Sequence, residues 1–165
     1  MEWYVIHTKP RQESRALLNL QNQGYSVYLP ICPVQKLRNG KVKTQLDPLF
    51  ARYLFIELSL ARNGQSWAPI RSTLGVSTLL MFGNEPARVD SQLIDVLRTR
   101  EQVVMNEPVA LHQPGDKLVI TEGPFAGLEA VYQMADGEAR AIVLIDILSR
   151  PTKLNVAMQT LRKSA

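Results

Sequence analysis

The chain begins with a short run of apolar residues, after which the pattern changes to a helical spacing. In residues 2–8 (EWYVIHT), Trp3, Val5 and His7 alternate with Tyr4, Ile6 and Thr8, which predicts a strand. Thr8 can cap a following helix, Pro10 suits its first turn, and Gly24 can end it. The pattern therefore predicts that the chain begins with a strand followed by a helix.

A tight turn interrupts the next polar stretch. Residues 33–45 (PVQKLRNGKVKTQ) contain Asn39-Gly40, a dipeptide typical of two-residue hairpin loops. Four cations surround this turn, namely Lys36, Arg38, Lys41 and Lys43. Further strands are predicted at 25–31, 50–58 and 76–82, and a short helix at 90–100. This order predicts an α+β sandwich of the ferredoxin type.

The pattern changes after residue 100. Residues 101–113 have no clear periodicity, so we expect a linker between a first domain (1–100) and a second domain (114–165). Short β-branched runs in the second domain predict a five-stranded miniature barrel. However, residues 127–134 (GLEAVYQM) favour helix, whereas residues 141–147 (AIVLIDI) alternate as a strand does. Propensity alone therefore leaves two folds open for this segment.

Composition excludes several classes of protein. With 45% hydrophobic residues the chain can bury a core, and no apolar run approaches the roughly 20 residues that span a bilayer. The start lacks a signal-peptide pattern and Cys32 is the single cysteine, so we expect a cytoplasmic protein. One Cys and two His make a structural zinc site unexpected, and no catalytic constellation or phosphate-binding loop appears. We therefore expect neither an enzyme nor a cofactor.

Charge is divided unevenly along the chain. Residues 1–100 contain 13 Lys and Arg against 7 Asp and Glu, a net charge of +6. Residues 101–165 contain 6 basic and 8 acidic residues, a net charge of −2, and the two values add to the +4 of the whole chain. A basic first half and an acidic second half indicate two modules with different partners.

Four segments, in this order, resemble the NusG-type transcription elongation factors. They are WYVIHTKPRQE, DPLFARYLFIEL, RSTLGVSTLL and GDKLVITEGPFAG, the last of which is similar to a KOW motif. The short chain and the tail sequence ADGEARAIVLIDIL resemble the specialised RfaH-like branch. The resemblance implies a NusG-type N-terminal α/β sandwich and a small KOW-type domain, folded as a β-barrel or as an RfaH-like α-helical hairpin. It implies an operon-specific antitermination factor that rides on bacterial RNA polymerase and suppresses pausing and termination.

The first predicted helix carries a polar stripe opposite its apolar face. At ~100° per residue, Arg11, Arg15, Asn19 and Asn22 lie on one side, where such side chains can bind phosphates and base edges, although any surface helix also needs a solvated face. RfaH-like factors use this surface on the non-template DNA strand. The two Asn, and Leu74 nearby, differ from the RfaH pattern, so we expect a different DNA target or weaker specificity. The implied DNA-binding residues are Lys9, Arg11, Gln12, Arg15, Asn19, Asn22, Arg71 and Thr73.

Aromatic residues in the predicted central strand have two interpretations. Such residues usually belong to a core, but Phe50 and Tyr53 would face opposite ways in a regular strand. The resemblance implies an apolar patch that binds a pair of helices in the polymerase β′ subunit, and a loop at 63–67 that touches the β subunit, unless it is an ordinary surface loop. The implied polymerase-binding residues are His7, Phe50, Tyr53, Phe55, Ile94, Leu97, Gln65, Ser66 and Trp67.

The tail of RfaH-like factors can mask that patch as a helical hairpin and refold as a barrel when released. The resemblance implies an acid–base lock between Asp47 and Arg140, an apolar cover from Tyr132, Leu144 and Ile147, and an S10-like ribosomal protein as partner of the released tail. Two alternatives remain open: a general NusG-type factor with a permanent barrel that couples polymerase to Rho or the ribosome, and a ribosomal or RNA-binding KOW protein. We expect a monomer without a membrane partner.

Overall fold

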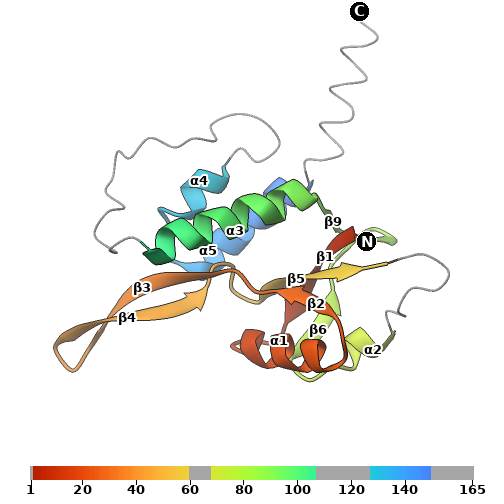
Figure 1. Cartoon of the computed structure of the whole chain (residues 1–165), viewed down its shortest axis with the longest axis horizontal. Coiled ribbons are helices and arrows are strands. Elements are labelled where there is room, and N and C mark those ends of the chain that lie inside the picture. The colour runs from red at the N-terminus through yellow and green to blue at the C-terminus, as the bar shows by residue number, and fades with distance from the viewer. Residues whose placement is uncertain (1, 60–67, 107–126, 150–165) are drawn as a thin grey trace, which may run out of the picture.

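An antiparallel sheet forms the centre of the molecule. The computed structural model describes residues 2–59, 68–106 and 127–149 of the 165-residue chain. Strand β1 lies in the middle and pairs with β5 on one side and with β6 and β9 on the other, while β2 extends the sheet beyond β5 (Figure 1). The strands are β1 (Glu2–Thr8), β2 (Ser26–Tyr28), β5 (Tyr53–Leu58), β6 (Val76–Leu79) and β9 (Arg88–Val89). The predicted first strand is thus confirmed.

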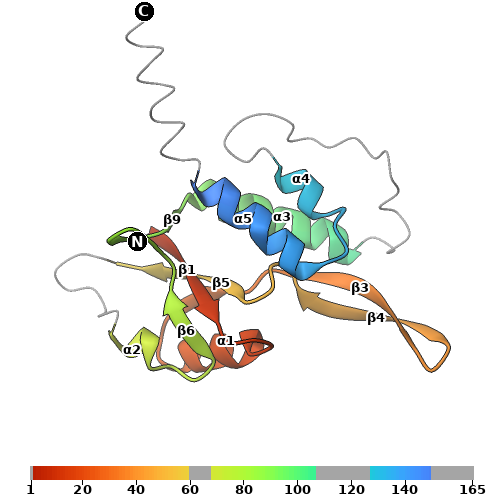
Figure 2. The same ribbon diagram turned by 180° about the vertical axis from the view of Figure 1, so that it is seen from behind.

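The alternation in β1 divides its side chains between two apolar layers. Tyr4 and Ile6 belong to one buried cluster, whereas Trp3 and Val5 belong to the other. Helices lie on both faces of the sheet, as the two opposite views show (Figures 1 and 2). The first face carries α1 (Glu13–Asn22) and α2 (Ala68–Arg71); the second carries α3 (Ser91–Asn106), α4 (Leu128–Val131) and α5 (Gly137–Ser149).

Two hairpins extend this framework. The predicted turn at Asn39 and Gly40 is confirmed, because both residues have positive φ angles, 52° and 74°, as a two-residue hairpin loop requires. It joins β3 (Ile31–Arg38) to β4 (Lys41–Pro48), and this two-stranded ribbon projects away from the sheet (Figure 1). A shorter hairpin joins β7 (Met81–Phe82) to β8 (Glu85–Pro86), so the predicted strand at 76–82 is divided in two.

Local contacts move three predicted boundaries. Helix α1 begins at Glu13 rather than directly after Thr8, because the Thr8 amide stays in the sheet region and donates to the Arg52 carbonyl at 2.8 Å. Strand β5 begins at Tyr53, since the preceding residues form a turn in which Arg52 has a φ of 70°. Helix α3 continues to Asn106, so the first six residues of the expected linker are helical; residues 107–113 lie outside the described residues.

The segment whose propensity was divided is a helix in this structure. Within α5, Ala141, Leu144, Ile147 and Leu148 recur at helical spacing and are all buried, while Ile142 is 73% exposed. Of the two folds that propensity leaves open for residues 141–147, this structure has the helix, because these residues satisfy a helical period when they pack on the sheet. The other β-branched runs from which the barrel is predicted, KLVIT (117–121) and KLNVAM (153–158), lie outside the described residues.

Two glycines allow the cost of a left-handed backbone to be measured separately from the cost of steric crowding. Gly75 and Gly83 both have positive φ, 92° and 67°, but a Cβ on Gly75 would lie 2.8 Å from the Ala16 amide nitrogen, whereas one on Gly83 would meet nothing within 4 Å. We expect Gly83→Ala to lower the free energy of unfolding by about 1 kcal/mol, the cost of left-handed backbone. Gly75→Ala should cost a further ~1–3 kcal/mol from overpacking. Urea denaturation measures both, and equal losses would contradict the close approach of α1.

Candidate functional site

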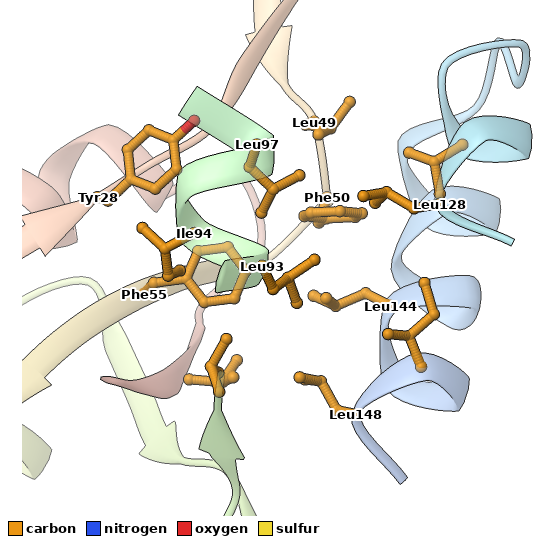
Figure 3. Close-up of a cluster of buried hydrophobic side chains, with 14 of the residues drawn as sticks. Tyr28, Leu49, Phe50, Phe55, Leu93, Ile94, Leu97, Leu128, Leu144 and Leu148 are labelled. Carbon is orange, nitrogen blue, oxygen red and sulfur yellow. The ribbon is translucent and has the colours of Figure 1, made fainter. Parts of the chain in front are cut away.

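The apolar residues expected to bind polymerase come together under α4 and α5. Phe50 and Phe55 are fully buried, and Ile94 and Leu97 on α3 are 1% exposed, all in one cluster. Figure 3 shows Leu144 on α5 pointing into this cluster from the opposite side. The remaining cover comes from α4 and α5, through Leu128, Val131, Ala141, Ile147 and Leu148. The structure thus joins the patch residues and covers them.

Phe50 owes its position to a turn rather than to a strand. Because it precedes β5, the alternation of that strand does not turn it away from Phe55, and the two rings meet edge to face at 6.3 Å between centroids. Strand alternation predicts that Phe50 and Tyr53 point in opposite directions, but both contact this cluster. The prediction is wrong because the strand begins at Tyr53 and not at residue 50.

His7 and Tyr53 form a partly exposed margin of the cluster. They lie opposite each other in the β1–β5 register, and their rings stack at 4.9 Å between centroids with an interplanar angle of 29°. Burial, and then the positive charge of Arg52, lower the pKa of His7 below its usual value. The imidazole is therefore neutral near pH 7, which suits a largely apolar contact surface.

Arg140 anchors α5 to the end of the β3–β4 hairpin. Its side chain is 3% exposed, and its guanidinium donates to the carbonyl oxygens of Leu49, Met134 (2.7 Å) and Pro48 (3.5 Å). A fork of fixed donors suits several carbonyl acceptors at once. The backbone adds another link, because the Ala51 amide donates to the Gly137 carbonyl at 3.1 Å.

The acid–base lock expected between Asp47 and Arg140 is not formed in this structure. Asp47 instead pairs with Lys36 at 3.2 Å and accepts a hydrogen bond from the Gln45 amide at 2.7 Å. The reason is local. Lys36 reaches Asp47 across the hairpin, while the carbonyls at the end of β4 occupy the donors of Arg140.

A second contact between the two modules was not predicted from the sequence. Arg100 on α3 pairs with Glu129 on α4 at 3.1 Å, and the Glu129 side chain is only 5% exposed. The Arg100 guanidinium also lies 4.7 Å from the ring centroid of Tyr132, which burial shields from solvent enough to raise its pKa. The only signal of this contact in the sequence was a charged residue, Glu129, inside the apolar segment GLEAVYQM. No neighbouring residue indicated that Arg100 is its partner.

The polar stripe expected to bind DNA is largely exposed on α1. Arg11, Arg15 and Asn22 are exposed, while Asn19 is half-buried and donates to the Arg15 carbonyl at 2.8 Å. Lys9 and Arg71 are also exposed, and Gln12 is half-buried at the start of the helix.

Thr73 does not belong to that exposed surface. It is 6% exposed, and its hydroxyl accepts from the Gln23 side chain at 2.7 Å and donates to the Pro69 carbonyl at 2.8 Å. Thr73 thus supports the neighbouring surface from below. The predicted loop residues Gln65, Ser66 and Trp67 lie outside the described residues.

The described part of the chain carries few other chemically active groups. Among those residues no group of three or more His, Cys, Asp or Glu is arranged to hold a metal ion. No helix there combines the length and apolar character needed to cross a bilayer. Cys32 is buried, and burial raises the pKa of its thiol.

An antiparallel sheet with helices on both faces and a projecting hairpin defines an α+β domain. A family model described as transcription termination factor nusG matches residues 1–98, more than half of the chain. The chain belongs to the NusG family.

Curated relatives agree with this assignment. The chain is 24% identical to the transcription termination/antitermination protein NusG of Streptomyces coelicolor over 99% of its own length. It spans 63% of the length of that relative. It is 25% identical to NusG of Thermus thermophilus, with 94% of this chain and 95% of the relative aligned. NusG of Deinococcus radiodurans is 24% identical, with 99% of each chain aligned.

The two interpretations of Arg140 predict different mutant behaviour. Arg140→Met leaves buried carbonyls without their donor, at a cost of roughly 1–3 kcal/mol, so we expect hydrogen-exchange protection of the α5 amides to fall about tenfold or more. Asp47→Asn removes only a half-exposed pair with Lys36 and should change that protection less than twofold. Equal losses in both variants would contradict the carbonyl-binding role.

Proposed function

We propose that this protein is an operon-specific transcription elongation and antitermination factor. It binds the β′ subunit of RNA polymerase through the cluster around Phe50, Phe55 and Ile94. The observation that carries the proposal is the cover: α5 buries this cluster through Leu144 and Ile147. A polymerase-binding surface covered by the chain's own tail gives a factor that acts only after release.

The cover favours the specialised factor over a general one. A general NusG-type factor with a permanent barrel needs its apolar surface available to polymerase at all times. Here the tail occupies that surface with buried apolar contacts, the guanidinium of Arg140 and the ion pair between Arg100 and Glu129. The general factor remains the second candidate, because the three relatives named above carry the name NusG.

Recruitment then depends on surfaces that the tail leaves uncovered. We assign the exposed side chains of α1, with Lys9 and Arg71, to the non-template DNA strand. The loop at 63–67 is assigned to the polymerase β subunit by family resemblance. After release, the C-terminal domain would be available to an S10-like ribosomal protein.

Opposite faces of α5 supply a matched test of masking. Leu144→Glu places a charge in the buried cluster, at a cost of roughly 3–5 kcal/mol for the docked state, so polymerase affinity should rise about tenfold or more. Ile142→Glu changes a residue that is 73% exposed on the same helix and should leave affinity unchanged. Phe50→Ala, added to Leu144→Glu, should weaken binding again. Binding of purified polymerase to the full chain, followed by fluorescence anisotropy, measures all three.

The ion pair across α3 and α4 allows a charge-swap test of the same proposal. Arg100→Glu and Glu129→Arg should each place like charges together in a poorly exposed contact and so raise polymerase affinity. The double variant restores opposite charges and should return affinity toward that of the unmodified chain. If the single variants bind polymerase no more tightly than the unmodified chain, the masking proposal is wrong.

A further inference from the structure

The β3–β4 ribbon carries a cationic face that neither the apolar cluster nor the α1 stripe includes. In its register, Lys36 lies opposite Lys43 and Arg38 lies opposite Lys41. Positions two apart on a strand point to the same side, so these four side chains share one face of the ribbon. All four are exposed.

This arrangement costs stability within the ribbon itself. Like charges directly opposite each other on neighbouring strands are destabilising, whereas opposite charges would stabilise the pair. An ion pair with Asp47 at 3.2 Å partly offsets this repulsion for Lys36. Within the described residues, Arg38, Lys41 and Lys43 have no salt-bridge partner. A face that concentrates unpaired positive charge at the expense of stability is suited to a polyanion.

The composition of the ribbon distinguishes a duplex from a single strand. Proteins that bind single strands combine cations with aromatic side chains on which bases stack. Residues 31–48 contain no aromatic residue, so the ribbon has no stacking platform. A duplex presents about one negative charge per ~1.7 Å of axis, and its major groove admits a two-stranded ribbon. Lys and Arg alone on the face favour contact with phosphates over base readout.

Acidic side chains separate the ribbon from the predicted DNA-binding surface on α1. Arg11 at the start of α1 and Lys36 on β3 line one groove, which the carboxylates of Glu13, Asp47, Asp136 and Glu138 also line. The cationic face is therefore confined to the ribbon, whose tip projects away from the sheet (Figure 1).

We propose that the cationic face of the β3–β4 ribbon, formed by Lys36, Arg38, Lys41 and Lys43, binds the phosphate backbone of duplex DNA without sequence preference. This site is separate from the apolar cluster under α5. It does not depend on the proposed function, because it requires no polymerase.

Two double variants of the full chain test the proposal on opposite faces of the same ribbon. Arg38→Gln with Lys41→Gln removes two charges from the cationic face. Gln35→Glu with Thr44→Glu lowers the net charge by the same amount on the other face, again at directly opposed positions. The probe is a blunt DNA duplex of about 25 base pairs, bound in ~0.1 M salt, beside single-stranded DNA and duplex RNA of equal length.

We expect the first double variant to bind duplex DNA roughly 10- to 60-fold more weakly, with a salt slope smaller by about 1.8, because each phosphate contact contributes ~0.9 to that slope. The other-face variant and single-stranded binding should change less than threefold. The thermal midpoint of the first variant should be unchanged or higher, since a repulsive pair is removed.

Other outcomes overturn the proposal. Equal losses of duplex affinity in the two double variants would show that binding depends on net charge and not on the cationic face. An equal loss for single-stranded DNA would remove the assignment to a duplex, and tighter binding of duplex RNA than of duplex DNA would remove the assignment to DNA. Dependence on the duplex sequence would show base readout instead of phosphate contact.

Discussion

Burial of one apolar sheet face organises the molecule. Side chains from β1, β5 and the turn before β5 are too apolar to be left in water, and α3 alone does not close over Phe50. Helices α4 and α5 complete the layer. The described part of the second module is helical because its apolar residues then recur on the side that packs against this surface. The hydrogen bonds of Arg140 and the ion pair of Arg100 then fix the orientation of a contact that apolar burial alone would leave adaptable.

The sequence of α5 is only partly suited to this helix. Its buried positions recur with a helical period, yet Ile142 is largely exposed and Ile145 is half-buried, so two branched apolar side chains remain at or near solvent. β-Branched residues also lower helix propensity. A strand in a small barrel would place Val143, Ile145 and Ile147 on one face together. The same residues thus support a helix that depends on its docking surface, which is consistent with release as the step that our proposed function requires.

Elements specified by neighbouring residues were predictable, whereas contacts between distant segments were not. The first strand, the Asn39-Gly40 turn and the end of α1 just before Gly24, which has a positive φ, follow from local patterns. The position of Phe50 depended on a turn with positive φ at Arg52, for which the sequence offers no glycine. The carbonyl partners of Arg140 are more than 90 residues away for Leu49 and Pro48, and no side-chain pattern identifies backbone acceptors. Family resemblance indicated that Leu144 and Ile147 cover the apolar cluster, but it paired Arg140 with Asp47 instead of with these carbonyls.

The uneven charge of the two halves of the chain comes from a few identifiable groups with different positions in the structure. Among the described residues, the modules are held together by the apolar cluster, by the Arg100–Glu129 ion pair and by hydrogen bonds from the buried Arg140 guanidinium to the carbonyls of Leu49 and Pro48. The net charges of +6 and −2 therefore explain little of the contact. The exposed cations of α1 and of the β3–β4 ribbon lie outside the covered cluster and remain accessible while α5 is docked. Under the proposed function, masking therefore acts on the apolar surface alone. If these cations bind nucleic acid as proposed, an electrostatic, salt-sensitive encounter precedes the apolar contact.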